Sequence, residues 1–289
     1  MATGNMIHSR CRGIFAALAL LPATAAFAAL PSGYMEFEYI QGNGIDARII
    51  TDYTPKPNQD KIEAVVSFPS GTLDKNQAIW CARGADSRTK TYTLFALKDS
   101  SDNKYKFRFD YYATPGTFCT PALVADDGKY TVTADGNVFT WSGGTGQTHD
   151  KVADFTAAGG PLVLFYSYTS NSGNDKQNFA KHKLYSVKVW RSDALIHDFV
   201  PSMRLSDYAA GLYDVTSNKF YAGTGTLTLM DHWDASAYVA ASGYVAASPD
   251  EAKSDASSFV SFLFNKKETA PMESIFKSTK PLGFTLIVR

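Results

Sequence analysis

The stretch Lys104-Tyr105-Lys106-Phe107-Arg108-Phe109-Asp110-Tyr111 gives the most direct indication of the fold. Aromatic residues occupy every second position of this stretch, and charged residues fill the positions between them. Successive side chains of a β-strand point to opposite faces of the sheet. The stretch therefore predicts an antiparallel strand with one buried aromatic face and one solvated charged face.

A hairpin is predicted a little further along the chain. Tyr130–Ala134 and Asn137–Trp141 both alternate, and they flank Asp135-Gly136, a dipeptide that tolerates the positive φ angles of a two-residue turn. Similar segments recur from Tyr34 to Met230 without a convincing helical stretch between them. We expect the remaining strands at Ile62–Phe68, Ala78–Arg83, Tyr92–Lys98, Pro161–Tyr166, Lys183–Trp190, Leu195–Val200, Gly211–Val215, Lys219–Tyr221 and Thr226–Met230. Together they predict an all-β fold, a two-sheet antiparallel β-sandwich.

Composition narrows the class of protein. The 289 residues carry no net charge, and charged residues make up 19% of the chain, less than the roughly 25% of an average soluble domain. Aromatic residues, at 13%, supply ample material for a core. A disordered charged chain is thereby excluded, and the chain lacks the basic excess that nucleic-acid binding requires.

Residues 1–28 resemble an export signal. Arg10 and Arg12 precede the apolar run Gly13–Leu21, and Ala26-Phe27-Ala28 supplies the small residues that a signal peptidase recognises. An uncleaved membrane anchor is the alternative, but the run is short for a span of about 20 residues. We expect cleavage after Ala28, no membrane span in the remaining chain, and a secreted, periplasmic or cell-surface location.

Cys81 and Cys119 are the cysteines that remain after such a cleavage. In an oxidising compartment they can form one disulfide, and the alternative is two separately buried thiols. Both interpretations stay open at this point. No histidine cluster lies near either cysteine in the sequence, so they predict no zinc site.

Several motifs in a fixed order resemble one family. They are Leu30–Ile40, Thr51–Pro55, Lys183–Trp190, Asp198–Pro201, Gly211–Asp214 and Lys219–Tyr221. In this order they are similar to bacterial and phage domains of the concanavalin A-like, laminin-G-like jelly-roll class. Cys81 is a departure, because related domains often carry glycine there. The resemblance implies a two-sheet jelly roll over residues 29–230, whose concave face often holds carbohydrate or protein partners. It does not imply catalysis, because the fold also hosts lectins, lyases and spacers.

Candidate catalytic groups are few. Glu36 and Glu38 are spaced to share one strand face, as the carboxylates of a retaining glycosidase must, but no third carboxylate follows them. His197 beside Asp198 could serve as a general base of a lyase. A solvated edge strand and an ordinary strand-edge histidine explain these residues better, so we assign no catalytic residue.

Three acidic loops raise the question whether the protein binds calcium. The loops Asp99–Asn103, Asn171–Asp175 and Asp126-Asp127 are rich in the oxygen ligands that calcium prefers. Asp and Asn are also the usual turn residues, and no EF-hand pattern is present. We therefore predict no cofactor and no metal ligand, with Ca²⁺ as the alternative.

Aromatic and amide side chains are the candidate ligand-binding groups. Sugars stack on flat aromatic faces and accept hydrogen bonds from amides. From a wider aromatic set that also includes Trp190, Tyr111 and Tyr112, we select Tyr166, Tyr168, Asn171, Asn174, Trp80 and Trp141.

The Ala/Ser-rich segment 231–289 differs from the rest of the chain. Tyr238–Ser242 is nearly repeated at Tyr244–Ser248, and Ser248-Pro249-Asp250-Glu251 predicts the start of a helix that reaches about Phe264. Gly283–Arg289 reads as a terminal strand. An apolar terminal strand can add to an exposed sheet edge, so this strand would dock on the chain's own sandwich, or it would serve as a tail recognised during sorting or assembly.

Three functional hypotheses follow. The first is an exported, non-catalytic, lectin-like module that recognises a glycan or a surface protein. The second is a glycan-active enzyme, a glycoside hydrolase or polysaccharide lyase, on the same fold. The third is a structural or assembly module that engages a partner through the terminal strand.

Overall fold

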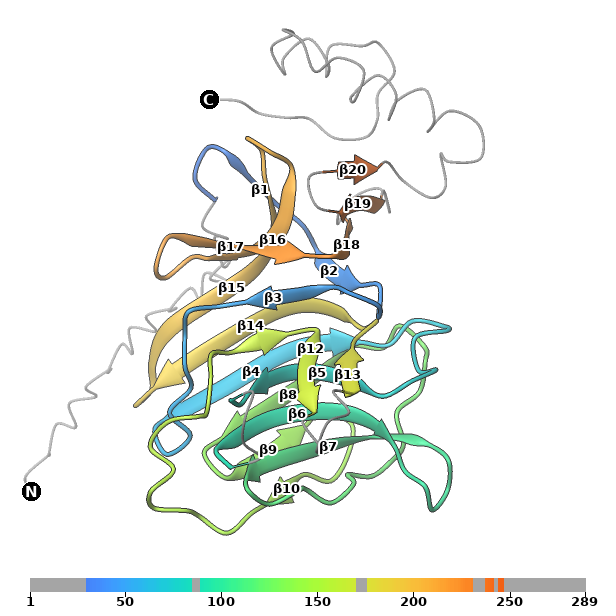
Figure 1. Cartoon of the computed structure of the whole chain (residues 1–289), viewed down its shortest axis with the longest axis vertical. Helices are drawn as coiled ribbons and strands as arrows, with labels where there is room; N and C mark the ends of the chain where they lie inside the picture. Colours follow the sequence, from blue (N-terminus) through green and yellow to red (C-terminus); the bar gives the residue numbers. More distant parts are fainter. Residues whose placement is uncertain (1–29, 85–88, 170–175, 231–236, 242–243, 247–289) are drawn as a thin grey trace, which may run out of the picture.

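The computed structural model describes residues 30–84, 89–169, 176–230, 237–241 and 244–246 (Figure 1). Every regular element in these ranges is a β-strand, which confirms the all-β prediction. No helix in the described ranges is long and apolar enough to cross a membrane. The predicted signal, the helix near Pro249 and the strand Gly283–Arg289 lie outside the described residues.

Eighteen of the described strands form one antiparallel sheet, which is nearly barrel-shaped and has two parts. The first part contains β1 (Tyr34–Glu36), β2 (Tyr39–Gly42), β4 (Asp60–Ser67), β8 (Tyr130–Asp135), β9 (Val138–Trp141), β10 (Gln147–Thr148), β14 (Lys183–Arg191), β15 (Ala194–Arg204), β16 (Ala209–Asp214), β18 (Thr226–Met230), β19 (Ala237–Ala241) and β20 (Tyr244–Ala246). The second part contains β3 (Arg48–Ile50), β5 (Gln77–Ala82), β6 (Thr91–Lys98), β7 (Tyr105–Tyr112) and β11 (Val163–Leu164). The strands β12 (Tyr166–Thr169) and β13 (Lys176–Phe179) form a separate hairpin.

The strand β17 (Lys219–Thr224) links the two parts. It pairs with β16 through Lys219–Ala222 and with β3 through Gly223 and Thr224. At the far edges the Gln147 side chain links β10 to β7, because its amide accepts from the Phe109 N–H at 3.3 Å and donates to the Phe109 carbonyl at 2.7 Å. An amide side chain thus takes the place of a neighbouring backbone and covers part of an exposed strand edge.

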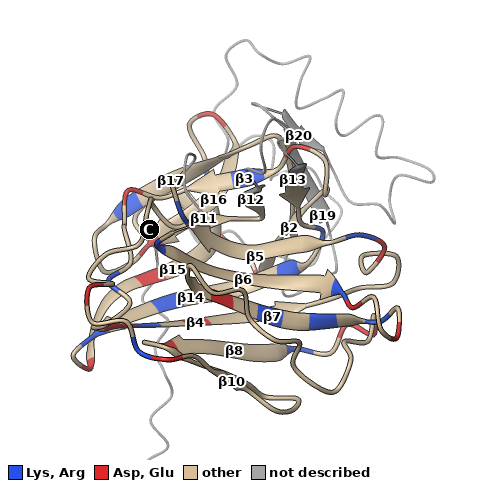
Figure 2. Ribbon diagram, turned by 60° about the horizontal axis from the view of Figure 1, so that its bottom comes forward, with Lys and Arg blue, Asp and Glu red and all other residues tan. Residues whose placement is uncertain are grey.

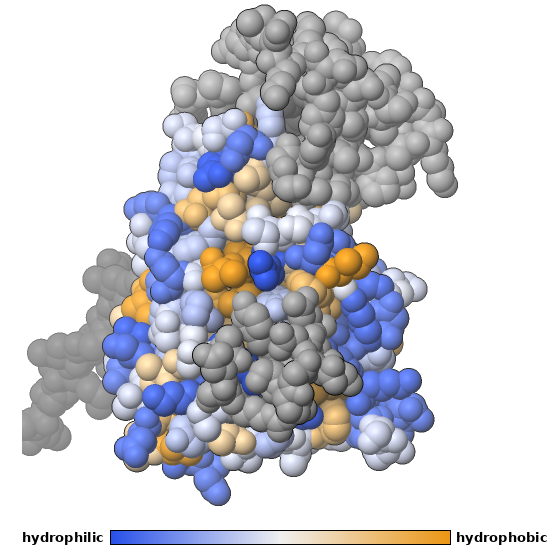
Figure 3. Space-filling model, viewed as in Figure 1, coloured by the Kyte–Doolittle hydropathy of each residue, from blue (hydrophilic) through white to orange (hydrophobic). Residues whose placement is uncertain are grey.

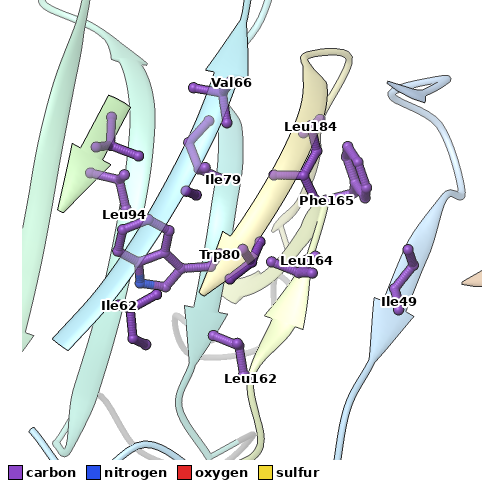
Figure 4. Packing of buried hydrophobic residues seen from close by; sticks show 14 of the residues in the cluster. Ile49, Ile62, Val66, Ile79, Trp80, Leu94, Leu162, Leu164, Phe165 and Leu184 are labelled. Carbon is purple, nitrogen blue, oxygen red and sulfur yellow. The ribbon is translucent and has the colours of Figure 1, made fainter. Parts of the chain in front are cut away.

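The core lies between the two parts of the sheet. Figure 4 shows the Trp80 ring of β5 among Ile62 of β4, Leu94 of β6 and Leu164 of β11. All four side chains are fully buried. Residues from both parts therefore share one continuous hydrophobic cluster.

Two local predictions are confirmed in detail. The hairpin β8–β9 pairs Asp135 with Val138, and Gly136 has a φ of 58°. Phe107, Phe109 and Tyr111 of β7 point into the core, as the alternation predicted, whereas Lys106 on the charged face is buried rather than solvated. Alternation of apolar and polar residues is thus sufficient to predict a strand and its buried face when the other face is polar.

Two other segments differ from the sequence predictions. The single strand expected at Pro161–Tyr166 is divided at Phe165, whose φ of 65° ends β11 and starts β12. The near-repeat after Met230 forms the hairpin β19–β20, and β19 pairs with β18. The sheet therefore continues beyond residue 230.

The two cysteines form no disulfide. Cys81 and Cys119 are both buried thiols, and Cys81 receives a contact of 3.5 Å from the Thr93 hydroxyl. Cys119 hydrogen-bonds to the Phe107 carbonyl on β7, so β6 and β7 separate the two residues. Neighbouring strands of a sheet lie about 4.8 Å apart. With two strands between them, Cys81 and Cys119 are further apart than the roughly 7 Å between Cα atoms that a disulfide can span.

His182 is a polar group inside the core. Its side chain is fully buried, and it stacks on Phe165 with 4.7 Å between ring centroids. Neither ring nitrogen has a hydrogen-bond partner among the described residues. Burial lowers the pKa of His182 to about 3, so the imidazole is neutral in the folded protein.

We expect His182 to make the protein sensitive to acid. The unfolded chain binds a proton at His182 near pH 6.5 and the folded chain does not, so stability falls as the pH drops from about 6.5 towards 3. The slope from this residue is about 1.4 kcal/mol per pH unit. Urea unfolding of the wild type and of His182→Phe between pH 7.5 and 4.5 measures it. The variant should lose less stability in acid. If the unfolding free energies of the two proteins fell in parallel with pH, His182 would not titrate in this way.

Candidate functional site

The candidate site is the outward side of the central strands β4, β14 and β15. Ile62, Ala64 and Val66 of β4 point into the core, so the residues between them point outward. The register places outward residues of β14 and β15 beside them. We call this surface the outer face, and its central residues are Lys61, Glu63, Val65, Lys188, Trp190 and Asp198. All six are half-buried.

Charges of both signs meet in the middle of the outer face. Lys188 lies opposite Glu63 on one side and opposite Asp198 on the other, and its Nζ is 3.8 Å from an Asp198 carboxylate oxygen. Figure 2 shows acidic and basic positions side by side on β14 and β15. The middle of the outer face thus offers hydrogen-bond donors and acceptors together.

Two carboxyl groups on this side hold protons more tightly than usual. Burial raises the pKa of Asp198, and the Asp214 charge adds to this although Lys188 opposes it. Burial also raises the pKa of Glu36 on β1, and the Asp198 charge raises it further. Asp198 is therefore a partly desolvated acceptor beside Lys188.

Aromatic rings lie at the two ends of β14, each beneath a lysine. The Lys61 ammonium is 4.3 Å from the centroid of Trp190 at one end. The Lys129 ammonium is 4.0 Å from the centroid of Tyr185 at the other end, where the Tyr185 ring also contacts Tyr39 at 5.4 Å. These are cation–π contacts on a partly solvated surface.

A buried ion pair fixes the Trp190 end of the outer face. Arg191 binds the fully buried Asp60 through two hydrogen bonds, of 2.7 and 3.1 Å. The Tyr53 hydroxyl and the Lys56 N–H also donate to Asp60. Asp60 directly precedes Lys61, and Arg191 directly follows Trp190. The ion pair therefore holds Lys61 opposite Trp190.

His197 does not act on the outer face. Its Nδ1 lies 2.6 Å from a carboxylate oxygen of the fully buried Asp214, and its ring packs between Tyr53 and Phe199 at 4.5 and 5.3 Å. The candidate pairing with Asp198, which the sequence did not favour, does not form, because neighbouring residues of a strand point to opposite faces. Burial raises the pKa of Asp214, but hydrogen bonds from His197 and Ser217 outweigh it and lower the pKa overall.

Glu36 and Glu38 do not form a pair on one strand. β1 ends at Glu36 and β2 begins at Tyr39, so Glu38 lies in the break between the two strands. Its carboxylate binds the Lys129 ammonium at 2.9 Å. The spacing of the two glutamates therefore does not produce a shared strand face.

The predicted binding aromatics are mostly core residues. Trp80 is fully buried, and Tyr166 is 1% exposed with the Arg48 guanidinium 5.5 Å from its ring centroid. Trp141 is 7% exposed, donates from Nε1 to the Thr145 carbonyl at 2.8 Å and packs on Phe107. These three side chains do not present a surface to a ligand.

The remaining predicted residues are Tyr168, Asn171 and Asn174. Tyr168 lies on β12, and Asn171 and Asn174 lie outside the described residues. Trp190 belongs to the wider aromatic set, and the sequence alone does not separate it from the buried tryptophans.

The acidic loop Asp99–Asn103 already contains a cation. The Lys106 ammonium lies 2.8 Å from Asp99 and 2.7 Å from Asp102. The hydrogen bond from Lys106 and those from Ser101 lower the pKa of Asp99 to about 2. Asp126 caps a turn by accepting from the Gly128 N–H. No cluster of three potential metal ligands occurs among the described residues.

Exposed apolar surface is small on the described part of the chain. The large apolar side chains that it exposes are Ile45, Ile50, Val124, Val138 and Leu195. Figure 3 shows such surface as small orange areas within a mostly hydrophilic face. The described surface therefore favours recognition by polar groups over docking on a broad apolar patch.

Comparison with known proteins gives no family. No protein-family model matches the chain, and no curated protein matches it. Among solved structures, a SAP-like pentraxin from Limulus polyphemus is 12% identical with a TM-score of 0.38, over 56% of this chain and 76% of the pentraxin. Tailspike protein 2 from Escherichia coli O157:H7 bacteriophage CAB120 is 16% identical with a TM-score of 0.34, over 50% of this chain and 21% of the tailspike. Scytalido-glutamic peptidase is 11% identical with a TM-score of 0.30, over 64% of this chain and 92% of the peptidase.

We expect the Asp60–Arg191 pair to contribute strongly to stability. Arg191→Leu leaves a buried carboxylate without its counter-charge and should lower the free energy of unfolding by about 3 kcal/mol, the low end for buried pairs because the Arg191 side chain is 30% exposed. The double variant Asp60→Asn, Arg191→Leu should lose less than the sum of the single variants, with a coupling on the order of 2 kcal/mol.

The matched control is Arg204→Leu. Arg204 binds Asp207, whose side chain is 48% exposed whereas that of Asp60 is fully buried, so the same substitution there should cost less than about 1 kcal/mol. Chemical unfolding of the wild type, the two single variants, the double variant and Arg204→Leu measures these differences. Equal losses for Arg191→Leu and Arg204→Leu would contradict a special role for the buried pair.

Proposed function

We propose that this protein is an exported, non-catalytic, lectin-like module that binds a carbohydrate on its outer face. The observation that carries the proposal is the partly exposed indole of Trp190 on the same sheet face as Glu63, Lys188 and Asp198. A sugar presents apolar C–H faces and a rim of hydroxyl groups. An aromatic ring beside donors and acceptors of both signs matches that combination.

The finer fold assignment belongs to the same proposal. A concanavalin A-like jelly-roll sandwich is supported by one hydrophobic cluster shared by the two parts of the sheet. Three of the motifs that carry the family resemblance, Asp198–Pro201, Gly211–Asp214 and Lys219–Tyr221, lie on the consecutively paired strands β15, β16 and β17. Motifs separated in sequence thus meet in one piece of sheet.

The candidate acid and base residues each bind another side chain of the protein. These contacts favour binding over catalysis. Glu38, half of the predicted carboxylate pair, is bound to Lys129. His197, the predicted base, is bound to Asp214 and packed against Tyr53 and Phe199. Both residues already have structural partners, which supports a glycan-binding role over a hydrolase or lyase.

Export is the third element of the proposal. The basic start at Arg10 and Arg12, the apolar run Gly13–Leu21 and the small residues Ala26 and Ala28 support removal of a signal peptide. A secreted, periplasmic or cell-surface protein meets glycans and surface proteins directly. The location and the ligand class therefore agree.

Trp190→Ala should weaken glycan binding about tenfold, which corresponds to ~1.4 kcal/mol, because the stacking surface is removed. Trp190→Phe should keep most of the affinity. Binding is measured by titration calorimetry with the glycans that score on an array of neutral and acidic polysaccharides. The control is Phe118→Ala, which removes a half-buried aromatic that packs against Ala78, Phe95 and Leu97 in the second part of the sheet. An array without any bound glycan, or full affinity in Trp190→Ala, would refute the proposal.

Expression of the full chain in a Gram-negative host should yield a protein that begins at Ala29. Mass spectrometry of the exported fraction measures the mature N-terminus. Ala28→Trp should block processing, because the peptidase pocket admits only small side chains there. An unprocessed wild-type chain retained in the cytoplasm would disprove the export proposal.

A further inference from the structure

We propose that the ligand is a linear glycan several sugars long, which lies along β14 and stacks on Trp190 at one end and on Tyr185 at the other. This inference rests on the proposed glycan-binding function and adds the shape of the ligand to it. The juxtaposition that carries it is the presence of both rings on the outer face.

A bulge places the two rings on one face. Tyr185 and Trp190 are five positions apart, and an odd separation on a regular strand points two side chains to opposite faces. The register of β14 with β4 shifts between Leu184 and Ser186, so Tyr185 is an extra residue without a partner on β4. A bulge of this kind reverses the alternation, and Tyr185 comes to lie on the outer face with Trp190.

Contacts of Tyr185 confirm its direction. Its hydroxyl lies 3.2 Å from the hydroxyl of Ser67, which continues the outward series of β4 after Val65. Leu184 and Val187, on either side of the bulge, are both fully buried in the core. The core packing of β14 is therefore retained while a second ring is added to the outer face.

The spacing of the rings sets the length of the ligand. Five residues of strand, at about 3.3 Å each, separate them by roughly 16 Å. A single pyranose ring is much shorter than this distance. Between the rings lie Ser186, which is opposite Val65, and Lys188, which is flanked by Glu63 and Asp198, so the path offers both apolar surface and polar groups. This path suits a chain of hydroxylated rings better than one terminal sugar.

The two ring sites differ in how firmly a lysine covers them. Lys61 covers Trp190, and among the described residues no carboxylate forms an ion pair with Lys61. Lys129 covers Tyr185 and is held there by Glu38 at 2.9 Å. A sugar must displace the lysine to stack on the ring. Trp190 is therefore the primary site, and Tyr185 adds affinity once a ligand is long enough to reach it.

The experiment uses the full chain after export and oligomers of one to eight sugars prepared from cellulose, xylan, chitin and starch. Affinity for the oligomer series that binds should rise at least tenfold between two and six units and then level off. Trp190→Ala should weaken every oligomer of that series. Tyr185→Ala should weaken only the long oligomers, about fivefold, and Tyr185→Phe should bind as the wild type does.

A second variant guards against loss of folding in Tyr185→Ala. Lys129→Ala removes an exposed side chain from the Tyr185 ring and should strengthen binding of long oligomers alone. Affinity that does not depend on length, equal effects of Tyr185→Ala on short and long oligomers, or array binding to terminal sugars without binding to any of the four series would overturn the linear ligand. These outcomes leave the lectin-like function standing, whereas an array with no bound glycan removes both.

Discussion

The pairing of β4 with β14 is the constraint on which the rest of this structure depends. The two strands are paired from Asp60–Arg191 at one end to Ser67–Lys183 at the other, and β8, β15 and β2 extend the sheet from them. The buried Asp60–Arg191 ion pair closes one end of this ladder. A buried carboxylate tolerates few arrangements of its partners, because each must replace the water that the charge has lost. The ion pair therefore fixes which residues face the core and which face solvent.

One extra residue in this ladder reconciles two demands on β14. The core requires Leu184, Val187 and Val189 to be buried, and these positions do not follow a single period of two. The bulge at Tyr185 corrects the alternation within the strand. Its second consequence is that Tyr185 and Trp190, which a regular strand would separate, share the outer face. A feature that satisfies packing thus also shapes the candidate site.

Much of the strand pattern could be predicted from the sequence, but the side-chain partners could not. The alternation in β7 and the Asp135-Gly136 turn are local signals, and both are confirmed. The burial of Trp80 was not visible, because β5 and β6 are buried on both faces and show no alternation there. Lys106 in the acidic loop, and Asp214 as the partner of His197, depend on contacts that no local pattern encodes. Trp190 could be named as a candidate but not distinguished from Trp80 and Trp141.

The lysines over Trp190 and Tyr185 explain how the proposed aromatic binding surface can coexist with a hydrophilic exterior. Two exposed rings on an open sheet face would add to the apolar surface that promotes association. Lysine stems cover such surface while the ammonium groups remain in water, and the attraction of the ammonium to the ring is weak enough for a ligand to replace it. A lysine that is held less firmly is displaced more easily, so the ring beneath it becomes available to a ligand first. Because Glu38 holds Lys129 and no described carboxylate holds Lys61, the outer face favours initial contact at Trp190 and extension towards Tyr185.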